Sequence, residues 1–423
     1  MISPTKAGAP DAPGVPARRA ALKLLDAVLR RGLPIEAALG KATQGIERAD
    51  DRALAHAITA EVLRRLPDLD ALIDSATRQN LPDDAKARFA LRIALAQTLA
   101  LGTPPHAAIA TVLPLVDGGP RKLVHGVFGA LTRSGAKLPD VPTLPPVVAE
   151  RWTAAWGSEA AAAAARAIAA PPPIDLSLKH DDAVRPEGVS LAQRHLRVND
   201  SAHVPTLPGY GEGDWWVQDL AASLPARLIG RGTGRALDVC AAPGGKTLQL
   251  AAAGWRVTAL DVSESRLARL RENLERTGLD AEVVTADALK WSPDGQFDAV
   301  LIDAPCSATG IFRRHPDVLH RVTPRVIAET SALQAKLLAR AAEWVRPGGT
   351  LVYAVCSLEP EEGEAQLAAF LGTRIDYRVV SATVEELPAG VAPLPDGTVR
   401  TLPGMLEVQG GLDGFFIARL ERS

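Results

Sequence analysis

Two segments of the chain each combine a cysteine with small and polar residues. Cys306 lies in D-A-P-C-S-A-T-G (303–310), and Cys356 lies in Y-A-V-C-S (353–357). A lone cysteine is most often a small buried hydrophobic residue. Two thiols that follow neighbouring strands can instead perform covalent catalysis, in which one sulfur adds to the substrate and a second group assists its release. Spacing alone does not decide which cysteine attacks.

Metal binding and disulfide bonding are the other common uses of cysteine. The chain has three cysteines, the third being Cys240, and no C-x-x-C pair. A structural zinc site normally needs more closely spaced ligands. A disulfide framework is not expected in a cytosolic enzyme of this size. We therefore expect no metal and free thiols.

A glycine-rich turn, D-V-C-A-A-P-G-G-K-T (238–247), follows the predicted strand 236–239. A phosphate-binding P-loop would need glycine at Cys240, and Pro243 removes a backbone N–H from the loop. A dinucleotide fold needs its glycines after the strand, whereas Gly232 and Gly234 precede it. A structural turn without a ligand remains a further alternative.

S-adenosylmethionine fits the turn better, because this cofactor is a sulfonium cation without phosphate. Carboxylates follow three successive predicted strands, at Asp261, Asp287 and Asp303. Each of them alone is more often a turn residue, but ligands of such sheets bind beyond the strand ends. The predicted cofactor-binding residues are Cys240, Ala241, Ala242, Pro243, Gly244, Gly245, Lys246, Asp261, Asp287 and Asp303.

Two thiols and a carboxylate beside a methyl donor suggest methylation of a pyrimidine. Carbon 5 of cytosine becomes nucleophilic only after a thiolate has added to carbon 6. That chemistry needs a nucleophilic cysteine, an acid at the ring nitrogen and a base for elimination. Positive charge favours the thiolate, and Lys246, Arg313, Arg314 and the sulfonium are candidates to supply it.

Five segments are similar to motifs of the Sun (Nol1/Nop2) family of RNA cytosine-5 methyltransferases. They are C-A-A-P-G-G-K-T (240–247), D-A-P-C-S-A-T-G (303–310), R-R-H-P-D (313–317), V-C-S-L-E-P-E-E (355–362) and D-G-F-F-I-A-R (413–419). The resemblance implies that Cys356 is the nucleophile and that Cys306 assists product release. It also implies that Asp303 hydrogen-bonds the cytosine, and Lys246 completes the predicted catalytic set.

Two positions depart from the family pattern. The family usually has Ser-Thr before the nucleophile, where this chain has Ala354 and Val355, and it often has Pro-His where this chain has Pro403 and Gly404. The first change replaces small polar residues of the pocket with apolar ones, and the second alters a contact with RNA. Neither removes a catalytic group.

The N-terminal part is predicted to be helical and resembles a NusB-like RNA-binding domain, with A-R-R-A-A-L-K-L-L-D-A-V-L (17–29) in its first helix. Within the family, this fusion implies a bacterial enzyme that modifies 16S ribosomal RNA. Basic residues make the first helix a predicted RNA-contacting face: Arg18, Arg19, Lys23, Arg30 and Arg31. Trp215 and Trp216 could stack a base, although core packing is the preferred interpretation.

The elements that must position these residues predict a multi-domain α plus α/β protein. We expect a flexible tail (1–16), a NusB-like helical domain (17–136), a linker (137–146), a small connecting domain (147–214) and a Rossmann-like methyltransferase domain (215–423). In the last domain, apolar runs alternate with amphipathic helices, which predicts a mostly parallel sheet covered on both faces. Predicted strands four and five, 299–302 and 350–355, are then neighbours, so both cysteines face one cleft.

Composition sets the remaining expectations. The 423 residues are 47% hydrophobic and 23% charged, with a formal net charge of −2. We expect a cytoplasmic monomer with no membrane span, and RNA binding by local basic clusters. The same chemistry on transfer RNA or another RNA remains an alternative, as do a non-catalytic RNA-binding assembly factor and a dinucleotide oxidoreductase.

Overall fold

The computed structural model describes residues 12–198 and 203–423, which form two compact units. The helical unit comprises the described residues up to Glu150 together with His315–Arg321, and the α/β unit comprises the described residues of Arg151–Arg314 and Val322–Ser423. The predicted tail lies mostly outside the described residues, and the first helix begins at Val15. In the described part of the chain, no helix has both the length and the apolar character needed to cross a bilayer.

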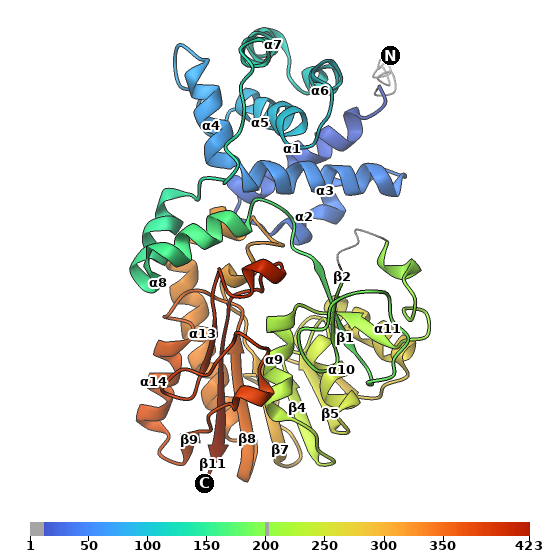
Figure 1. The fold of residues 1–423 in the computed structure, drawn as a ribbon, viewed down its shortest axis with the longest axis vertical. Helices are drawn as coiled ribbons and strands as arrows, with labels where there is room; N and C mark the ends of the chain where they lie inside the picture. Colours follow the sequence, from blue (N-terminus) through green and yellow to red (C-terminus); the bar gives the residue numbers. More distant parts are fainter. Residues whose placement is uncertain (1–11, 199–202) are drawn as a thin grey trace, which may run out of the picture. The chain divides into compact units, whose positions relative to one another are not determined.

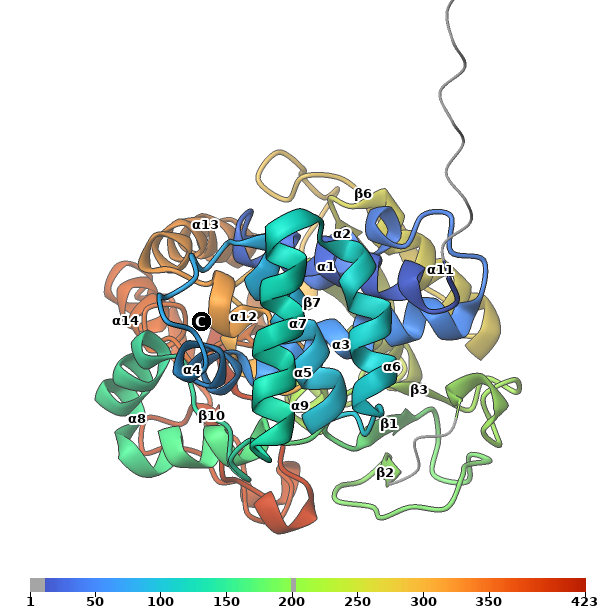
Figure 2. The same cartoon turned by 90° about the horizontal axis from the view of Figure 1, so that it is seen from above.

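The helical unit is built around α5, whose residues are almost all buried. α5 packs against α7, and α1 packs against α3 (Figure 2). Leucine, isoleucine and alanine side chains from these helices form one continuous apolar core, which confirms the predicted all-helical domain. The helices are α1 (Val15–Leu29), α2 (Ile35–Ala42), α3 (Ala49–Arg64), α4 (Leu66–Ser75), α5 (Lys86–Leu99), α6 (Pro105–Val112), α7 (Gly118–Arg133) and the short α12 (Val318–Arg321).

The basic residues of α1 do not form the continuous exposed face that the sequence suggests. Arg18 is buried, and its Nε donates to Gln97 Oε1 at 2.7 Å. Arg30 and Arg31 both lie within ion-pair distance of Asp26. The expectation of an RNA-contacting face is therefore wrong for Arg18, because α1 is central to the helical unit and turns that side chain inward.

The α/β unit contains a small antiparallel sheet with the strand order β2-β1-β3. Its strands are β1 (Ile174–Leu178), β2 (His195–Val198) and β3 (Trp215–Val217). Trp215 and Trp216 are buried, and their indole N–H groups donate to Pro208 O and Gln218 Oε1. Core packing of both tryptophans is thereby confirmed. The alanine-rich run Ser158–Ala170 predicts a helix, and the structure has the longer α8 (Pro146–Ala167), which bends at Gly157.

The large sheet has the strand order β10-β11-β8-β7-β4-β5-β6, and β9 also pairs with β11 (Figure 1). β4 to β8 are mutually parallel, whereas β11 runs antiparallel to β8. The strands are β4 (Arg235–Val239), β5 (Arg256–Asp261), β6 (Glu282–Thr285), β7 (Phe297–Asp303), β8 (Val345–Val355), β9 (Tyr377–Val379), β10 (Val399–Thr401) and β11 (Phe415–Arg422). This arrangement confirms the Rossmann-like prediction and adds an antiparallel edge.

Helices cover both faces of this sheet because its strands are apolar on both sides. On β7, Val300 and Ile302 pack with α13, whereas Ala299 and Leu301 pack with α9 and α10. The helices are α9 (Leu220–Ile229), α10 (Gly245–Ala252), α11 (Glu264–Thr277), α13 (Pro324–Ala342) and α14 (Glu364–Thr373). The chain runs from β4 outward to β6 and returns at β7, so the switch point lies between β4 and β7. Ligand sites of such sheets lie beyond the strand ends at this point.

The Asp70 carboxylate should contribute strongly to the stability of the helical unit. It accepts from the buried guanidiniums of Arg88 at 3.0 Å and Arg92 at 2.8 Å. We expect Asp70→Ala to lower the free energy of unfolding by about 3 kcal/mol, because the buried Arg92 guanidinium loses its carboxylate partner, whereas Arg88 keeps Asp74. Asp26→Ala is the control, because Asp26 pairs with the exposed Arg30 and Arg31. It should lower the free energy of unfolding by at most about 1 kcal/mol. Equal effects in urea unfolding would contradict this assignment.

Candidate active site

The turn after β4 has little free backbone N–H with which to hold a phosphate. Ala241 N donates to Leu260 O and Ala242 N donates to Asp261 Oδ2, both at 3.1 Å, while Pro243 has no N–H. Gly244 adopts φ 111°, and a Cβ there would lie 2.3 Å from Leu270 Cδ1. Glycine is therefore required at this position by both conformation and space.

The three predicted cofactor carboxylates lie at the carboxyl ends of strands, and different hydrogen bonds hold each of them. Asp261 and Asp303 are the last residues of β5 and β7, and Asp287 lies just after β6. Asp261 accepts from the N–H groups of Ala242 and Ser263, which fixes its orientation. Asp287 Oδ1 accepts a hydrogen bond from Leu289 N in the same loop, and the Asp287 side chain remains partly exposed. Asp303 Oδ2 accepts from Lys246 Nζ at 2.7 Å. Their remaining lone pairs suit hydroxyl groups, amines or positive charge.

Asp238 is a further carboxylate to which sequence reasoning assigned no role. It is fully buried in β4, and burial raises its pKa to about 7. Its Oδ2 accepts from Thr247 Oγ1 at 2.6 Å, whereas Oδ1 has no partner among the described residues. A carboxylate inside an apolar strand, directly before a glycine turn, was the sequence signal that could have drawn attention to it.

The donor set around this turn fits S-adenosylmethionine rather than a dinucleotide. The amides of Ala241 and Ala242 are already used, and the groups at the strand ends are carboxylates. Such a site favours a cationic ligand and opposes a pyrophosphate. In the described part of the chain, no group of three His, Cys, Asp or Glu side chains is arranged to hold a metal ion.

The two cysteines predicted to share a cleft lie directly against each other. Cys306 Sγ and Cys356 Sγ are 3.4 Å apart. The adjacent parallel strands β7 and β8 bring their loops together, and Ala304 N donates to Ala354 O and Gly310 N donates to Cys356 O. The hydrogen bond with Cys356, together with burial and the charge of Glu362, raises the pKa of Cys306 well above its ordinary value. Cys306 therefore remains a protonated thiol at neutral pH.

Lys246 is the cation of the site. Burial alone would lower its pKa, but Asp303 and then Asp238 and Cys356 outweigh that effect and raise it. Its ammonium group also lies 5.5 Å from the centroid of the Phe415 ring. Cys240, by contrast, lies in the turn as a thiol whose pKa burial raises to about 12, so it remains unreactive and serves as a wall of the turn.

The arginines predicted to help ionise the thiol are instead engaged in a buried ion-pair cluster. Arg313 and Arg314 both contact the carboxylates of Asp219 and Asp413 at 2.9 to 3.6 Å. Two positive and two negative charges cancel locally. The expectation for both arginines is therefore corrected: they tie the start of α9 to the loop before β11, and Lys246 is the cation beside the cysteine pair.

Glu362 joins the two cysteine loops, although sequence reasoning assigned it no role. Its fully buried carboxylate accepts a hydrogen bond from Ser307 N at 2.8 Å. The two carboxylate oxygens also accept hydrogen bonds from hydroxyl and amide side chains of both cysteine loops and of α13. These side-chain donors are Ser307, Ser357, Thr330 and Gln334. Among the described residues it forms no ion pair. Hydrogen bonds from uncharged groups therefore hold the buried Glu362 carboxylate between Ser307 and Ser357, the residues that follow the two cysteines.

Comparison with known proteins finds similarity to RNA methyltransferases along almost the full chain. Residues 228–421 match the family model described as 16S rRNA methyltransferase RsmB/F, and residues 15–129 match the NusB family. Ribosomal RNA small subunit methyltransferase B of Xanthomonas campestris pv. campestris is 34% identical, over 97% of this chain and 98% of that protein. The Xylella fastidiosa (strain Temecula1) protein of the same name is 36% identical, over 96% and 98%. The crystal structure of PH0851 superposes with a TM-score of 0.73 and 23% identity, over 98% of this chain and 100% of that one.

A Rossmann-like sheet with a glycine turn, strand-end carboxylates and an adjacent thiol pair defines an S-adenosylmethionine-dependent methyltransferase. The full-length identity to the relatives then fixes the family. The chain belongs to the 16S rRNA methyltransferase RsmB/F family and carries the NusB domain at its N-terminus.

Glu362→Gln tests whether this carboxylate positions the cysteines. The amide offers one acceptor oxygen to donors that now share two, so the loops should shift and methyl transfer should slow by up to about 100-fold. Because the charge of Glu362 helps to raise the pKa of Cys306, its removal should also move alkylation of Cys306 to lower pH, as measured by peptide mass spectrometry.

The exposed neighbour Glu361 provides the matched control, since its side chain lies outside this network. Glu361→Gln should leave both the rate and the alkylation profile unchanged. If Glu362→Gln lost stability but kept the alkylation profile of Cys306, the carboxylate would have only a structural role.

Proposed function

We propose that the chain methylates carbon 5 of a cytosine in 16S ribosomal RNA through a covalent bond between Cys356 and the base. The observation that carries this proposal is the pair of thiols 3.4 Å apart beside the cofactor turn. A pair of thiols in which Cys306 stays protonated suits a reaction in which one sulfur attacks and the other remains a thiol.

The assignment of Cys356 as the nucleophile is supported by the electrostatics of the pair. The raised pKa of Cys306 keeps the proton of the pair on that sulfur. Lys246 lies close enough to Cys356 for the charge of that sulfur to raise the pKa of the lysine, so a cation stands beside the proposed nucleophile. The family resemblance assigns the same roles.

The residues then divide the work as follows. The Cys356 thiolate forms a bond to carbon 6, and N3 of the ring takes a proton from the Asp303–Lys246 pair, so that carbon 5 becomes nucleophilic. S-adenosylmethionine, when bound, supplies the methyl group. A water molecule takes the carbon-5 proton, the bond between sulfur and carbon 6 breaks with its electron pair returning to sulfur, and N3 gives up its proton. The Cys306 thiol donates to the departing Cys356 sulfur and so assists release.

The cofactor would be held by the glycine turn and the carboxylates around it. We assign the backbone of residues 240–245 to the wall of the site, and Asp261, Asp287 and Asp303 to the polar and charged groups of the cofactor. The orphaned Oδ1 of the buried Asp238 adds a fourth acceptor behind the turn. The 16S substrate is supported by the family and by relatives that match over almost their whole length.

Single cysteine variants separate the two proposed roles. Cys356→Ala should abolish methyl transfer, because no sulfur adds to the ring. Cys306→Ala should instead accumulate a covalent protein–RNA adduct, because release lacks its donor, and a slow band on a denaturing gel would show it. An adduct with Cys356→Ala and none with Cys306→Ala would reverse the assignment.

The RNA target can be tested in cells. Bisulfite sequencing should show that a deletion strain lacks one 5-methylcytosine of 16S RNA. Expression of the chain from a plasmid should restore that modification. A plasmid that carries Cys356→Ala is the matched control and should not. An intact 16S pattern with a lost site in transfer RNA would contradict the proposed substrate.

A further inference from the structure

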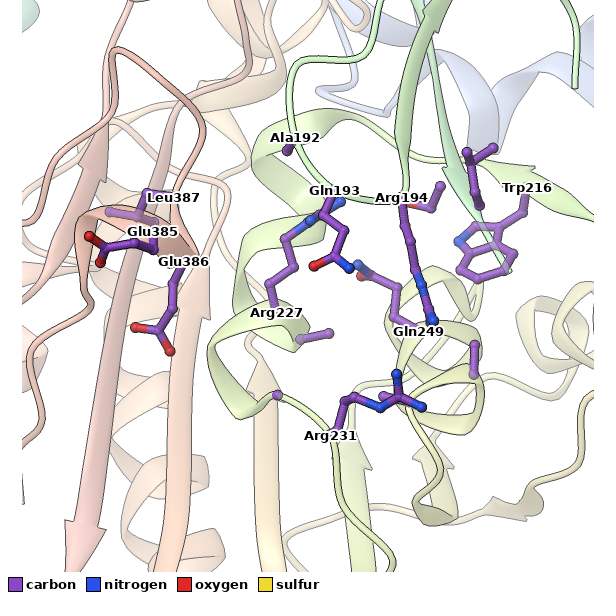
Figure 3. A pocket seen from close by; sticks show the side chains of 16 residues that line it. Ala192, Gln193, Arg194, Trp216, Arg227, Arg231, Gln249, Glu385, Glu386 and Leu387 are labelled. Carbon is purple, nitrogen blue, oxygen red and sulfur yellow. The ribbon is translucent and has the colours of Figure 1, made fainter. Parts of the chain in front are cut away.

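A basic cavity of about 360 Å³ lies in the α/β unit, apart from the residues assigned to catalysis. It is formed by β1, the loop at 192–194, the ends of α9 and α10, and the loop at 385–387 (Figure 3). Its size falls in the range of small-ligand pockets, about 300–1,000 Å³. No residue of the cofactor turn or of either cysteine loop lines it. The cavity is therefore not part of the methyl-transfer site.

Three guanidinium groups from separate segments line this cavity. Figure 3 shows Arg194 from the loop just before β2, Arg227 near the end of α9, and Arg231 from the loop that follows α9. Arg227 Nε donates to Ser223 Oγ at 3.0 Å, and neither Arg227 nor Arg231 pairs with a carboxylate among the described residues. Arg194 has one weak carboxylate contact, to the exposed Asp181 at 3.4 Å. The cavity thus carries uncompensated positive charge.

Arg194 and Arg227 are close enough for the positive charge of one to affect the pKa of the other. Burial, together with the charge of Arg194, lowers the pKa of Arg227 to about 10. Two guanidiniums that repel each other in a partly enclosed space are stabilised by an anion placed between them.

Neutral groups of the cavity add hydrogen-bonding capacity. Gln193 presents its side-chain amide in the same view (Figure 3), whereas Gln249 Nε2 already donates to Ser223 O and Gln249 Oε1 accepts from Gln218 Nε2. Ser177, which is 2% exposed, also lines the cavity, and its Oγ has no hydrogen-bond partner among the described residues. A buried hydroxyl without a partner is costly. A ligand oxygen within the cavity would satisfy it.

Acidic residues on the opposite wall do not neutralise the arginines. Glu386 is held by the guanidinium of Arg419 at 2.6 Å, and Figure 3 shows Glu385 turned away from the arginines. The arginines therefore face the cavity with no acidic side chain of the described residues paired to them on the opposite wall, as in an anion-binding site.

From this geometry we propose that the cavity binds a phosphate group, carried either by a nucleotide of the RNA strand or by a free nucleotide. Planar guanidiniums match phosphate oxygens in pairs, and the Ser177 hydroxyl and the Gln193 amide N–H can donate to further phosphate oxygens. The RNA source rests on the proposed function. A phosphate contact remote from the cysteines would fix the register of the RNA rather than read its sequence.

The test compares Arg227→Gln/Arg231→Gln with the wild type, using the full chain. RNA affinity is measured by fluorescence anisotropy across a range of salt concentrations, and AMP binding by calorimetry. The double variant should bind RNA about tenfold more weakly, with a salt slope smaller by about 1. Lys336→Gln, at an exposed position on α13, is the matched control and should match the wild type. Thermal melting verifies folding, and Arg227→Lys/Arg231→Lys should recover most of the slope.

The outcomes separate the two phosphate sources. A reduced RNA slope supports the RNA strand as ligand. AMP binding that the double variant loses, with RNA affinity unchanged, supports the phosphate site but assigns it to a free nucleotide. Unchanged RNA binding and no AMP binding would overturn the site. Because these measurements do not depend on methyl transfer, a wild-type chain without cytosine-5 methylation would count against the proposed function and not against the cavity.

Discussion

The buried carboxylate of Glu362 connects the two loops on which the chemistry depends. Neighbouring parallel strands bring Cys306 and Cys356 to one edge of the sheet, but strand pairing alone does not set the distance between two side chains on flexible loops. Glu362 supplies that constraint, since it accepts from Ser307 and Ser357, the residues directly after the cysteines. Hydrogen bonds to a charged group contribute about 1.5–3 kcal/mol each, so the network resists separation of the loops.

The same carboxylate also makes the two thiols unequal. Its charge helps to raise the pKa of Cys306, whereas Lys246 offers positive charge close to Cys356. Lys246 is in turn held by Asp303 at 2.7 Å. Structural support and chemical differentiation of the cysteines therefore come from the same few buried charges. This is the physical basis for two different roles in a pair of identical side chains.

Much of this arrangement could be predicted from sequence, where local pattern and motif agree. Apolar runs located β4, β5, β6, β7 and β8, and the adjacency of β7 and β8 predicted a shared cleft for the cysteines. The antiparallel pairing of the short β9 and β10 with β11 has no local signature, because these strands have three residues each. The full extent of α8 was also missed, since Gly157 interrupts its helical pattern.

Long-range electrostatics set the limit of sequence reasoning at the site. Arg313 and Arg314 resembled free cations near the cysteine loop, but their partners Asp219 and Asp413 lie about a hundred residues away in the chain. The donors to Glu362 come from segments up to 55 residues distant. The motif contained Glu362, yet only the folded chain shows that it faces Ser307 and not solvent.

The central claim is that Cys356, and not Cys306, bonds to the base. RNA that contains 5-fluorocytosine traps the adduct, because fluorine at carbon 5 replaces the proton whose loss permits release. Digestion of the wild-type complex and tandem mass spectrometry identify the modified cysteine. The account predicts a nucleotide on the peptide of Cys356 with Cys306 unmodified. A nucleotide on Cys306 would contradict it.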